Sequence, residues 1–311
     1  MKTSTRAAGI DAAKAKLDVA AHGLEGSASF NNNEAGWRAL LAWLLERDVD
    51  RVGIEASGGY ERGVSAYLRG FGLEVVTHQP AQVRAFARFK RIKAKNDKID
   101  AAVIAQATAQ TDLVRAAADP LIVELGDRLT AYEQAAELVA QLKTMLEHVA
   151  LPDLRAQYEA QLASLKAWKR RLAKDLTDRI AQHPQLARRF ALVISLPGVG
   201  QIVAASLVLR MPELGAMDRG QAASLLGVAP FDRDSGKTQG QRHIFGGRAR
   251  VRRMVYLAAT VARRIDPGFK AFAQRLANAG KKPKVVLVAV MRKLIEAANA
   301  VLGRGTPWLP A

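Results

Sequence analysis

The stretch AAGIDAAKAKLDVAA, residues 7–21, holds two short apolar runs separated by a segment with two lysines. Short apolar runs bounded by polar or turn-forming residues are typical of strands. We therefore expect a strand pair over residues 7–11 and 17–21, with a third short strand over 28–31. Asp11 ends the first run, so a carboxylate stands where that strand reaches its carboxyl end.

Alternating helix and strand signals follow this strand pair. Residues 34–47 carry apolar side chains at helical spacing, and residues 80–89 form a helix that a proline opens. Between them we expect a strand over 51–55, a helix over 60–71 and a strand over 73–77. Three strands followed by this alternation is the order of an RNase H-like sheet, with parallel pairing and helices on its faces. We expect an α/β domain over residues 1–115.

Four acidic residues of this domain are candidates for one site: Asp11, Glu55, Asp97 and Asp100. Asp11 and Glu55 each end an apolar run, while Asp97 and Asp100 lie three apart where a helix opens. For any one of them alone, a helix cap or a solvated surface charge is the better explanation, and this explanation weakens for the four as a set. As a set at the carboxyl ends of strands, they face the usual ligand crevice.

Four gathered carboxylates would repel one another without a cation. Hard oxygen ligands favour Mg²⁺ or Mn²⁺. Two such ions roughly 3.5–4 Å apart can activate an attacking hydroxyl and stabilise a leaving oxygen in phosphodiester chemistry.

The charge of the chain indicates a polyanionic partner. Its 311 residues include 47 Lys plus Arg and 29 Asp plus Glu, a formal net charge of +18. Such an excess attracts nucleic acid without specifying its sequence, although a merely soluble basic protein fits the same numbers. The absence of cysteine fits a reducing compartment, and we expect a cytoplasmic, nucleoid-associated protein with no membrane partner.

Residues 125–180 carry two apolar stripes at 4-3 spacing that meet at Pro152. Narrow stripes with charged flanks favour an antiparallel coiled-coil hairpin over an ordinary helical subdomain. We assign residues 116–184 to this hairpin. We expect it to pair the chain with a copy of itself as a dimer or tetramer.

Residues 185–311 form a third, mostly helical region. Its motif LPGVG, residues 196–200, resembles a helix-hairpin-helix turn that approaches phosphate, and a plain inter-helix turn is equally consistent with it. The segment DSGKTQGQRHIFGGR, residues 234–248, places Ser235 among glycines and cations. Ser235 is a candidate phosphoryl-transfer nucleophile. A serine that only donates a hydrogen bond to phosphate is the better explanation from these residues alone, because no general base stands beside it.

Two groups of cations are candidates for nucleic-acid binding. The first group lies just before the acidic pair: Arg84, Arg88, Lys90, Arg91, Lys93 and Lys95. The second group lies in and after the glycine-rich segment: Lys237, Arg242, Arg248, Arg252 and Arg253. Such residues grip the phosphate backbone.

Five motifs in this order resemble one family. They are GID with LDV (residues 9–11 and 17–19), EASGGYE (55–61), KNDKIDA (95–101), LPGVG (196–200), and SGK leading to GGR and VRR (235–253). The chain is similar to insertion-sequence transposases that join a DEDD, RuvC-like domain to a C-terminal transposase domain, a family that includes Piv-type DNA invertases.

The resemblance implies that Asp11, Glu55, Asp97 and Asp100 bind Mg²⁺ and that Ser235 becomes covalently joined to DNA. It also implies donor and target DNA as substrates, and a structured non-coding RNA of the element that guides their choice. Two other interpretations stay open: a RuvC-like Holliday-junction resolvase or nuclease that uses water, and a non-catalytic nucleic-acid scaffold.

Overall fold

The protein is described from a computed structural model that covers residues 6–92, 97–112, 119–231, 240 and 242–309, without the side chains of residues 97 and 98. The chain divides into two compact units, residues 1–118 and 119–311. The fold is mostly helical, with a mixed sheet in the first unit. Within the described residues, no helix has the length and apolar character needed to cross a membrane.

The first unit is built on a five-stranded sheet of order β3-β2-β1-β4-β5. The strands are β1 (Ala7–Ala12), β2 (Lys16–Ala21), β3 (Ser27–Asn31), β4 (Arg51–Glu55) and β5 (Glu74–His78). β1 pairs antiparallel with β2 and parallel with β4, and β4 pairs parallel with β5. The predicted strand pair and the predicted parallel pairing are confirmed, because the apolar runs that define these strands are short and clearly bounded.

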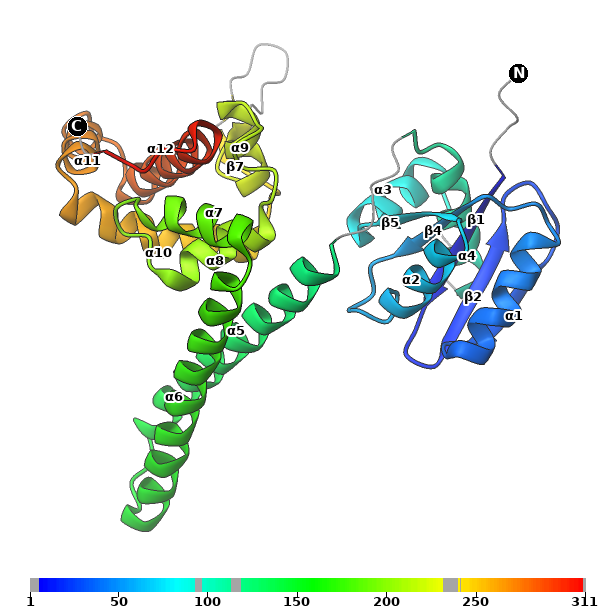
Figure 1. Cartoon of the computed structure of the whole chain (residues 1–311), viewed down its shortest axis with the longest axis horizontal. Coiled ribbons are helices and arrows are strands. Elements are labelled where there is room, and N and C mark those ends of the chain that lie inside the picture. Colours follow the sequence, from blue (N-terminus) through cyan, green and yellow to red (C-terminus); the bar gives the residue numbers. More distant parts are fainter. Residues whose placement is uncertain (1–5, 93–96, 113–118, 232–239, 241, 310–311) are drawn as a thin grey trace. The chain divides into compact units, whose positions relative to one another are not determined.

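Helices cover both faces of this sheet (Figure 1). They are α1 (Glu34–Leu45), α2 (Arg62–Gly70), α3 (Pro80–Phe89) and α4 (Asp97–Ala109). The main core of the unit lies on the face of α1 and α2, where Leu40 and Leu68 meet Ile10 and Ile54 of the strands. On the other face α4 packs on β1, β2 and β4, and α3 packs beside α4.

The second unit begins with two long helices and continues as a bundle of shorter ones (Figure 1). Its helices are α5 (Pro120–Leu146), α6 (Pro152–Ala181), α7 (Pro184–Ile194), α8 (Gln201–Arg210), α9 (Arg219–Leu226), α10 (Ala249–Ile265), α11 (Pro267–Asn278) and α12 (Pro283–Arg304). Five of these described helices begin at a proline, which suits the first helical position because its missing N–H has no intrahelical partner there.

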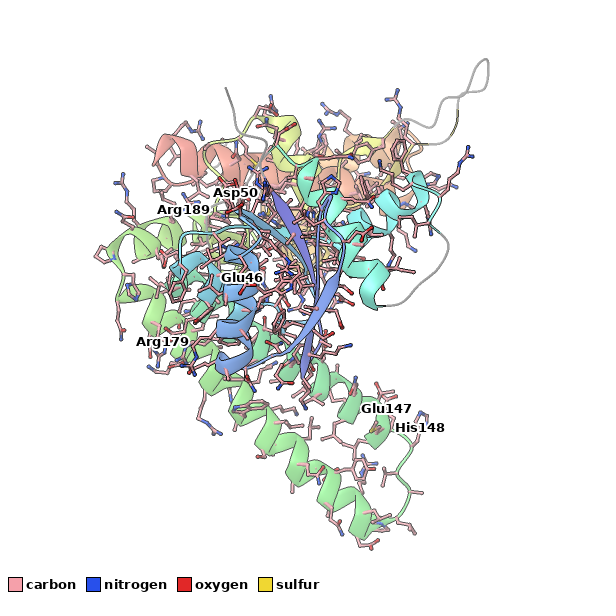
Figure 2. All side chains as sticks on the ribbon, turned by 90° about the vertical axis from the view of Figure 1, so that its right-hand side faces the viewer. Glu46, Asp50, Glu147, His148, Arg179 and Arg189 are labelled. Carbon is pink, nitrogen blue, oxygen red and sulfur yellow. The ribbon has the colours of Figure 1, made fainter. Side chains whose placement is uncertain are left out.

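The long helices α5 and α6 pack against each other, as the two apolar stripes predict. At the base of the pair, Leu129 and Ile180 are fully buried and share a cluster with Leu209 of α8. The turn between α5 and α6, marked by Glu147 and His148 in Figure 2, lies at the opposite end. Near this turn Met145 and Leu151 are exposed. The base is therefore part of the bundle core, and self-association through the hairpin remains a prediction.

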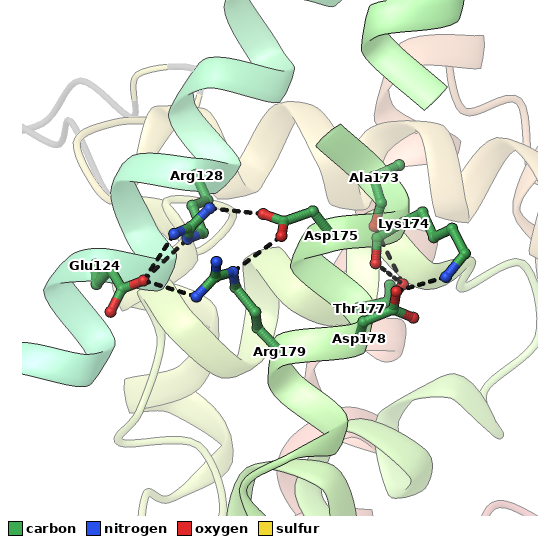
Figure 3. A network of polar contacts seen from close by, with 8 residues as sticks. All are labelled: Glu124, Arg128, Ala173, Lys174, Asp175, Thr177, Asp178 and Arg179. Atoms are coloured by element: carbon green, nitrogen blue, oxygen red, sulfur yellow. Dashed lines mark hydrogen bonds and ion pairs between the residues drawn. The ribbon is translucent and has the colours of Figure 1, made fainter. Parts of the chain in front are cut away.

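Four charged side chains tie α5 to α6 at this base (Figure 3). Arg128 contacts Glu124 at 2.9 Å and Asp175 at 2.6 Å. Arg179 contacts Asp175 at 2.9 Å and Glu124 at 3.3 Å. The hydrogen bond from Arg179, with the charge of Arg128, lowers the pKa of the Asp175 carboxyl.

The motif LPGVG forms the turn between α7 and α8. Gly198 has a φ of +74°, and a side chain there would collide with the backbone of Ala258 and Ala262 on α10. Close packing against α10 explains this glycine without a ligand, and a phosphate contact at the turn stays a prediction.

Candidate functional site

The two strand acids lie on one face of the sheet, at the ends of neighbouring strands. Ile10 and Ile54 are register partners and both pack into the core beneath α1 and α2. Side chains alternate between faces along a strand. Asp11 and Glu55, which follow directly, therefore project to the face that α4 covers, and both are half-buried.

Helix α4 is seated on this face by two glycines. Gly9 and Gly53 are register partners, each two residues before a strand acid. A side chain on Gly9 would collide with the backbone of Ala101 and Ala105, and one on Gly53 would collide with the hydroxyl of Thr108. The helix thus rests directly on the strand backbones, and residues four or seven apart form its contact stripe.

The direction of α4 brings the predicted acidic pair to the same end as the strand acids. The guanidinium of Arg51, the first residue of β4, donates to the carbonyl oxygen of Thr111, just beyond α4, at 2.8 Å. Because the helix ends near the beginning of β4, its first turn points toward the carboxyl ends of β1 and β4. Asp97 is the first residue of α4 and Asp100 follows in the same turn.

The donor set at this end suits a hard divalent cation. Carboxylate oxygens are the ligands that Mg²⁺ and Mn²⁺ prefer. Among the side chains that the structure describes, no group of three or more Asp, Glu, His or Cys lies close enough to hold a metal ion. Asp11, Glu55 and Asp100 are described and do not form such a group, and the side chain of Asp97 lies outside the described residues. The chemistry of the donors therefore fits a metal, and the assignment of Asp11, Glu55, Asp97 and Asp100 as its ligands stays a prediction.

The two loops that follow the strand acids are fastened to each other by Asn32. Its side-chain amide donates to the carbonyl oxygen of Ala13 at 2.9 Å and to that of Tyr60 at 3.0 Å. Its own oxygen accepts a hydrogen bond from the Trp37 indole N–H at 2.9 Å. Ala13 lies two residues after Asp11, so one half-buried amide joins the loop after β1 to the loop after β4.

The loop after β4 is also held by a contact with β1 and by contacts of its own. The Ser57 hydroxyl donates to the carbonyl oxygen of Ala12 at 2.7 Å. The Glu61 carboxylate accepts hydrogen bonds from the backbone N–H groups of Ser57 at 3.1 Å and Gly59 at 2.9 Å. Gly58 and Gly59 both have positive φ, which glycine adopts without strain. The motif EASGGYE thus encodes a closed loop that fixes the segment beside Glu55.

Two residues beside the strand acids were not identified from sequence. Asp18 is the register partner of Asp11 and is buried, with a contact to Lys16 at 2.9 Å and a hydrogen bond from Ser29. His78 is the register partner of Glu55. The alternation of LDVA in β2 is the signal that places Asp18 on the same face as Asp11.

His78 links β5 to α4. Its Nε2 lies 2.8 Å from the Thr108 hydroxyl, which donates to the carbonyl oxygen of Ile104 at 2.7 Å. Because that hydroxyl has one proton, His78 must donate from Nε2. Burial lowers the pKa of His78, consistent with a neutral ring.

The predicted phosphate-gripping residues Arg84, Arg88, Lys90 and Arg91 lie on or just after α3 and are exposed. The ammonium of Lys90 lies 5.6 Å from the centre of the Phe86 ring. Lys93 and Lys95 fall outside the described residues. The described part of this group therefore presents its charge to solvent, as backbone binding requires.

The predicted nucleophile Ser235 and Lys237 also lie outside the described residues. The two-residue strands β6 (Pro230–Phe231) and β7 (His243–Ile244) pair antiparallel on either side of this segment. After β7, Gly247 packs so closely on Gly227 that a side chain would collide with its backbone. The ends of the segment that carries Ser235 are thus anchored on the second unit.

The other predicted cations of this region have partners within the protein. Arg248 makes two contacts with Glu213, at 2.7 and 2.6 Å, and Arg253 contacts Glu137 at 2.8 Å. Arg252 donates to the carbonyl oxygen of Gly246. Arg242 is exposed. Arg248 and Arg253 must exchange a carboxylate for a phosphate if they are to bind nucleic acid, so their role remains a prediction.

Two transposase family models match most of the chain. The DEDD transposase model of the IS110 type matches residues 8–154. The model described as the transposase IS116/IS110/IS902 family matches residues 191–274. The first match contains all four predicted acids, and the second contains Ser235 and its neighbours. These matches define the class as DNA-recombining enzymes.

Similar proteins agree with this class. The chain is 26% identical to a pilin gene-inverting protein of Moraxella bovis over 322 residues, which covers 96% of each chain. The protein of that name from Moraxella lacunata is also 26% identical with the same coverage. An uncharacterized 42 kDa protein of insertion element IS900 from Mycobacterium paratuberculosis is 28% identical over 44% of this chain and 34% of its own length. The chain is thus an insertion-sequence transposase, whose N-terminal part matches the IS110-type DEDD transposase model and whose C-terminal part matches the IS116/IS110/IS902 model.

Proposed function

We propose that this protein excises and inserts DNA of an insertion sequence, using a Mg²⁺-dependent DEDD site in an RNase H-like domain and Ser235 as the nucleophile. The proposal is supported by the position of Asp11 and Glu55 at the ends of neighbouring parallel strands and by the direction of α4, whose first turn points toward that end of the sheet. Family membership supplies the reaction class.

In this proposal Asp11, Glu55, Asp97 and Asp100 hold Mg²⁺, or Mn²⁺ in its place. Bound there, the metal lowers the pKa of an attacking hydroxyl and stabilises charge on the leaving oxygen. The residues of the chain fix its position. The loops after β1 and β4 orient two ligands, and the glycine seat of α4 orients the other two.

Ser235 attacks a DNA phosphorus in this scheme. A bond forms from its Oγ to phosphorus, the bond to one strand end breaks, and that end leaves as a hydroxyl that takes the proton. Attack by a DNA hydroxyl on the phosphoserine then rejoins a strand and frees Ser235. The number of phosphodiester bonds is conserved, so rejoining needs no ATP. A serine hydroxyl needs activation at neutral pH. We therefore infer that Ser235 meets the acidic site, from the same chain or from a neighbouring copy.

The proposed partners are donor DNA, target DNA and a structured non-coding RNA that pairs with both. Delegating sequence choice to base pairing leaves the protein to bind backbones, for which its net charge of +18 is suited. Self-association through the α5–α6 hairpin, as a dimer or tetramer, would bring two reacting DNA ends together. The proposed excision and insertion of DNA would take place at the bacterial nucleoid, in the cytoplasm.

The metal requirement is tested by strand cleavage with purified protein, guide RNA and DNA from both ends of its element. We expect Asp11→Asn and Asp97→Asn to abolish cleavage with Mg²⁺ while circular dichroism stays unchanged. Lys14→Gln is a control in the exposed turn beside Asp11. Cleavage by both aspartate variants in the presence of a chelator would refute the metal role.

A further inference from the structure

The segment after the Ser235 region is strongly basic. Residues 249–311 contain 13 Lys or Arg and two acids, Asp266 and Glu296. Both acids are already engaged. Asp266 is buried and accepts a hydrogen bond from the backbone N–H of Phe269 at 2.9 Å. Glu296 contacts Arg292 at 2.9 Å and Arg219 at 3.2 Å. Among the described residues, neither carboxylate forms an ion pair with a cation of this segment other than Arg292.

An open groove of about 550 Å³ lies among the end of α10, the helix α11 and the start of α12. Four cations line it, namely Arg263, Arg264, Lys270 and Lys281, and its floor is formed by uncharged residues such as Ala273, Ala277 and Val286. Lys282 and Lys284 follow directly after Lys281 and are exposed. No acidic residue is among the groove's lining. We call these six cations the α11 groove set.

Within the parts of the chain that the structure describes, no member of the α11 groove set forms an ion pair. The cations at the beginning of α10 behave differently. Arg250 contacts Glu133 at 3.7 Å, and Arg253 contacts Glu137. The same helix thus carries neutralised arginines at its start and arginines without a carboxylate partner at its end.

This difference decides which cations gain most from a phosphate backbone. A paired arginine must first give up its carboxylate. An unpaired cluster of one sign repels itself, and bound phosphates remove that repulsion while releasing condensed counterions. The α11 groove set therefore offers a stronger backbone contact than the ion-paired cations do.

We propose that the α11 groove binds the phosphodiester backbone of duplex DNA independently of sequence. The proposal rests on the proposed function, because the DNA-recombining class of the enzyme is what selects DNA among polyanions. It adds a contact surface, Arg263, Arg264, Lys270 and Lys281, apart from the cations near the acidic site and the Ser235 segment. The groove would hold a DNA arm by its backbone, leaving the bases for pairing elsewhere.

The test is fluorescence anisotropy of the full chain with a 30-base-pair DNA duplex of mixed sequence, titrated at several NaCl concentrations. The variant Arg263→Gln/Arg264→Gln/Lys270→Gln/Lys281→Gln removes four charges from the groove. The matched control Arg155→Gln/Lys166→Gln/Arg170→Gln/Lys174→Gln removes four charges from exposed positions of α6. The two variants have the same net charge, so a difference in their DNA affinity reports where the lost charges lie and not how many were lost.

We expect the salt slope, log Kd against log[NaCl], to fall by about 3 to 4 in the groove variant, about 0.9 for each lost contact. Its Kd should rise at least tenfold, while the control stays within about twofold of wild type. If wild type binds DNA but the two variants have equal salt slopes, the proposal that the α11 groove binds DNA is refuted and the proposed function is not. Failure of wild type to bind DNA would overturn the proposed function as well. Tenfold tighter binding of a matching RNA duplex through the same residues would overturn DNA as the occupant.

Discussion

Replacing Asn32 should damage the metal site much more than it damages the fold. The Asn32 amide donates to carbonyl oxygens of the loops after β1 and β4 and accepts from the Trp37 indole. Asn32→Asp keeps the shape of the side chain but removes both donors and turns a carboxylate oxygen toward two carbonyl oxygens. Each lost hydrogen bond at such a half-exposed position is worth about 0.5–1.5 kcal/mol. We expect a loss of roughly 1–3 kcal/mol in unfolding free energy, and the two loops should separate.

The neighbouring residue Asn33 provides a matched control. Its side chain accepts the N–H of Gly36 at 3.0 Å and caps α1, away from both loops. Asn33→Ala should cost about 1 kcal/mol, as loss of an N-cap does. Asn32→Ala loses all three hydrogen bonds of its side chain and should cost roughly 1.5–4.5 kcal/mol in unfolding free energy, so metal affinity is compared at a temperature where both variants are fully folded.

The assay is calorimetric titration with Mn²⁺, together with cleavage against Mg²⁺ concentration and thermal unfolding of each variant. We expect both Asn32 variants to weaken metal affinity or cleavage by about 10-fold or more, in the range found when partners that orient metal ligands are lost. Asn33→Ala should stay within about twofold of wild type. Trp37→Phe removes one hydrogen bond to Asn32 and should give an intermediate effect. If Asn32→Ala and Asn33→Ala change metal affinity equally, Asn32 acts only through stability and the reasoning is refuted.

Three further predictions follow from the seat of α4 and from the hairpin. Gly53→Ala should destabilise the first unit by about 1–3 kcal/mol, because the new methyl group overlaps the Thr108 hydroxyl; adding Thr108→Ala should recover part of this loss in urea unfolding, and no recovery would argue against the seat. Asp175→Asn should cost about 0.5–1 kcal/mol near neutral pH, as exposed ion pairs do. Because folding lowers the pKa of Asp175 from 3.8, the stability difference between wild type and this variant should be fully present above pH 3.8 and should vanish as the pH falls through the lowered pKa. A stability difference that does not change with pH would contradict this. Replacing residues 143–157 by a short turn spares the buried base of the hairpin and should yield a monomer by light scattering; an unchanged mass would exclude the far end as the self-association surface.

The strands of the first unit could be predicted because their apolar runs are short and bounded by turns. The run over 51–55 coincides with β4, and the proline at 80 marks the start of α3. The common end of the sheet for Asp11 and Glu55 follows from parallel pairing. The direction of α4 could not be predicted, because it depends on the contact of Gly9 and Gly53 with a helix far along the chain.

The polar contacts that fix the site were also beyond sequence reasoning. Asn32 joins loops that are distant from each other in sequence, and nothing in the run of three asparagines distinguishes it from its neighbours. Counting lysines and arginines in the sequence also does not show which of them form ion pairs. Arg253 has a carboxylate partner and Arg263 has none among the described residues, yet both are arginines of one amphipathic helix.

The most direct test of the account is whether the protein becomes covalently joined to DNA through Ser235. Labelled DNA from the ends of its element is incubated with protein, guide RNA and Mg²⁺, quenched in denaturant and resolved by gel and peptide mass spectrometry. The account predicts a DNA-linked peptide that contains Ser235. This adduct should be absent in Ser235→Ala and Asp11→Asn, although both variants still bind DNA. Recombination by Ser235→Ala at near wild-type rate would contradict the serine mechanism and favour a resolvase that uses water.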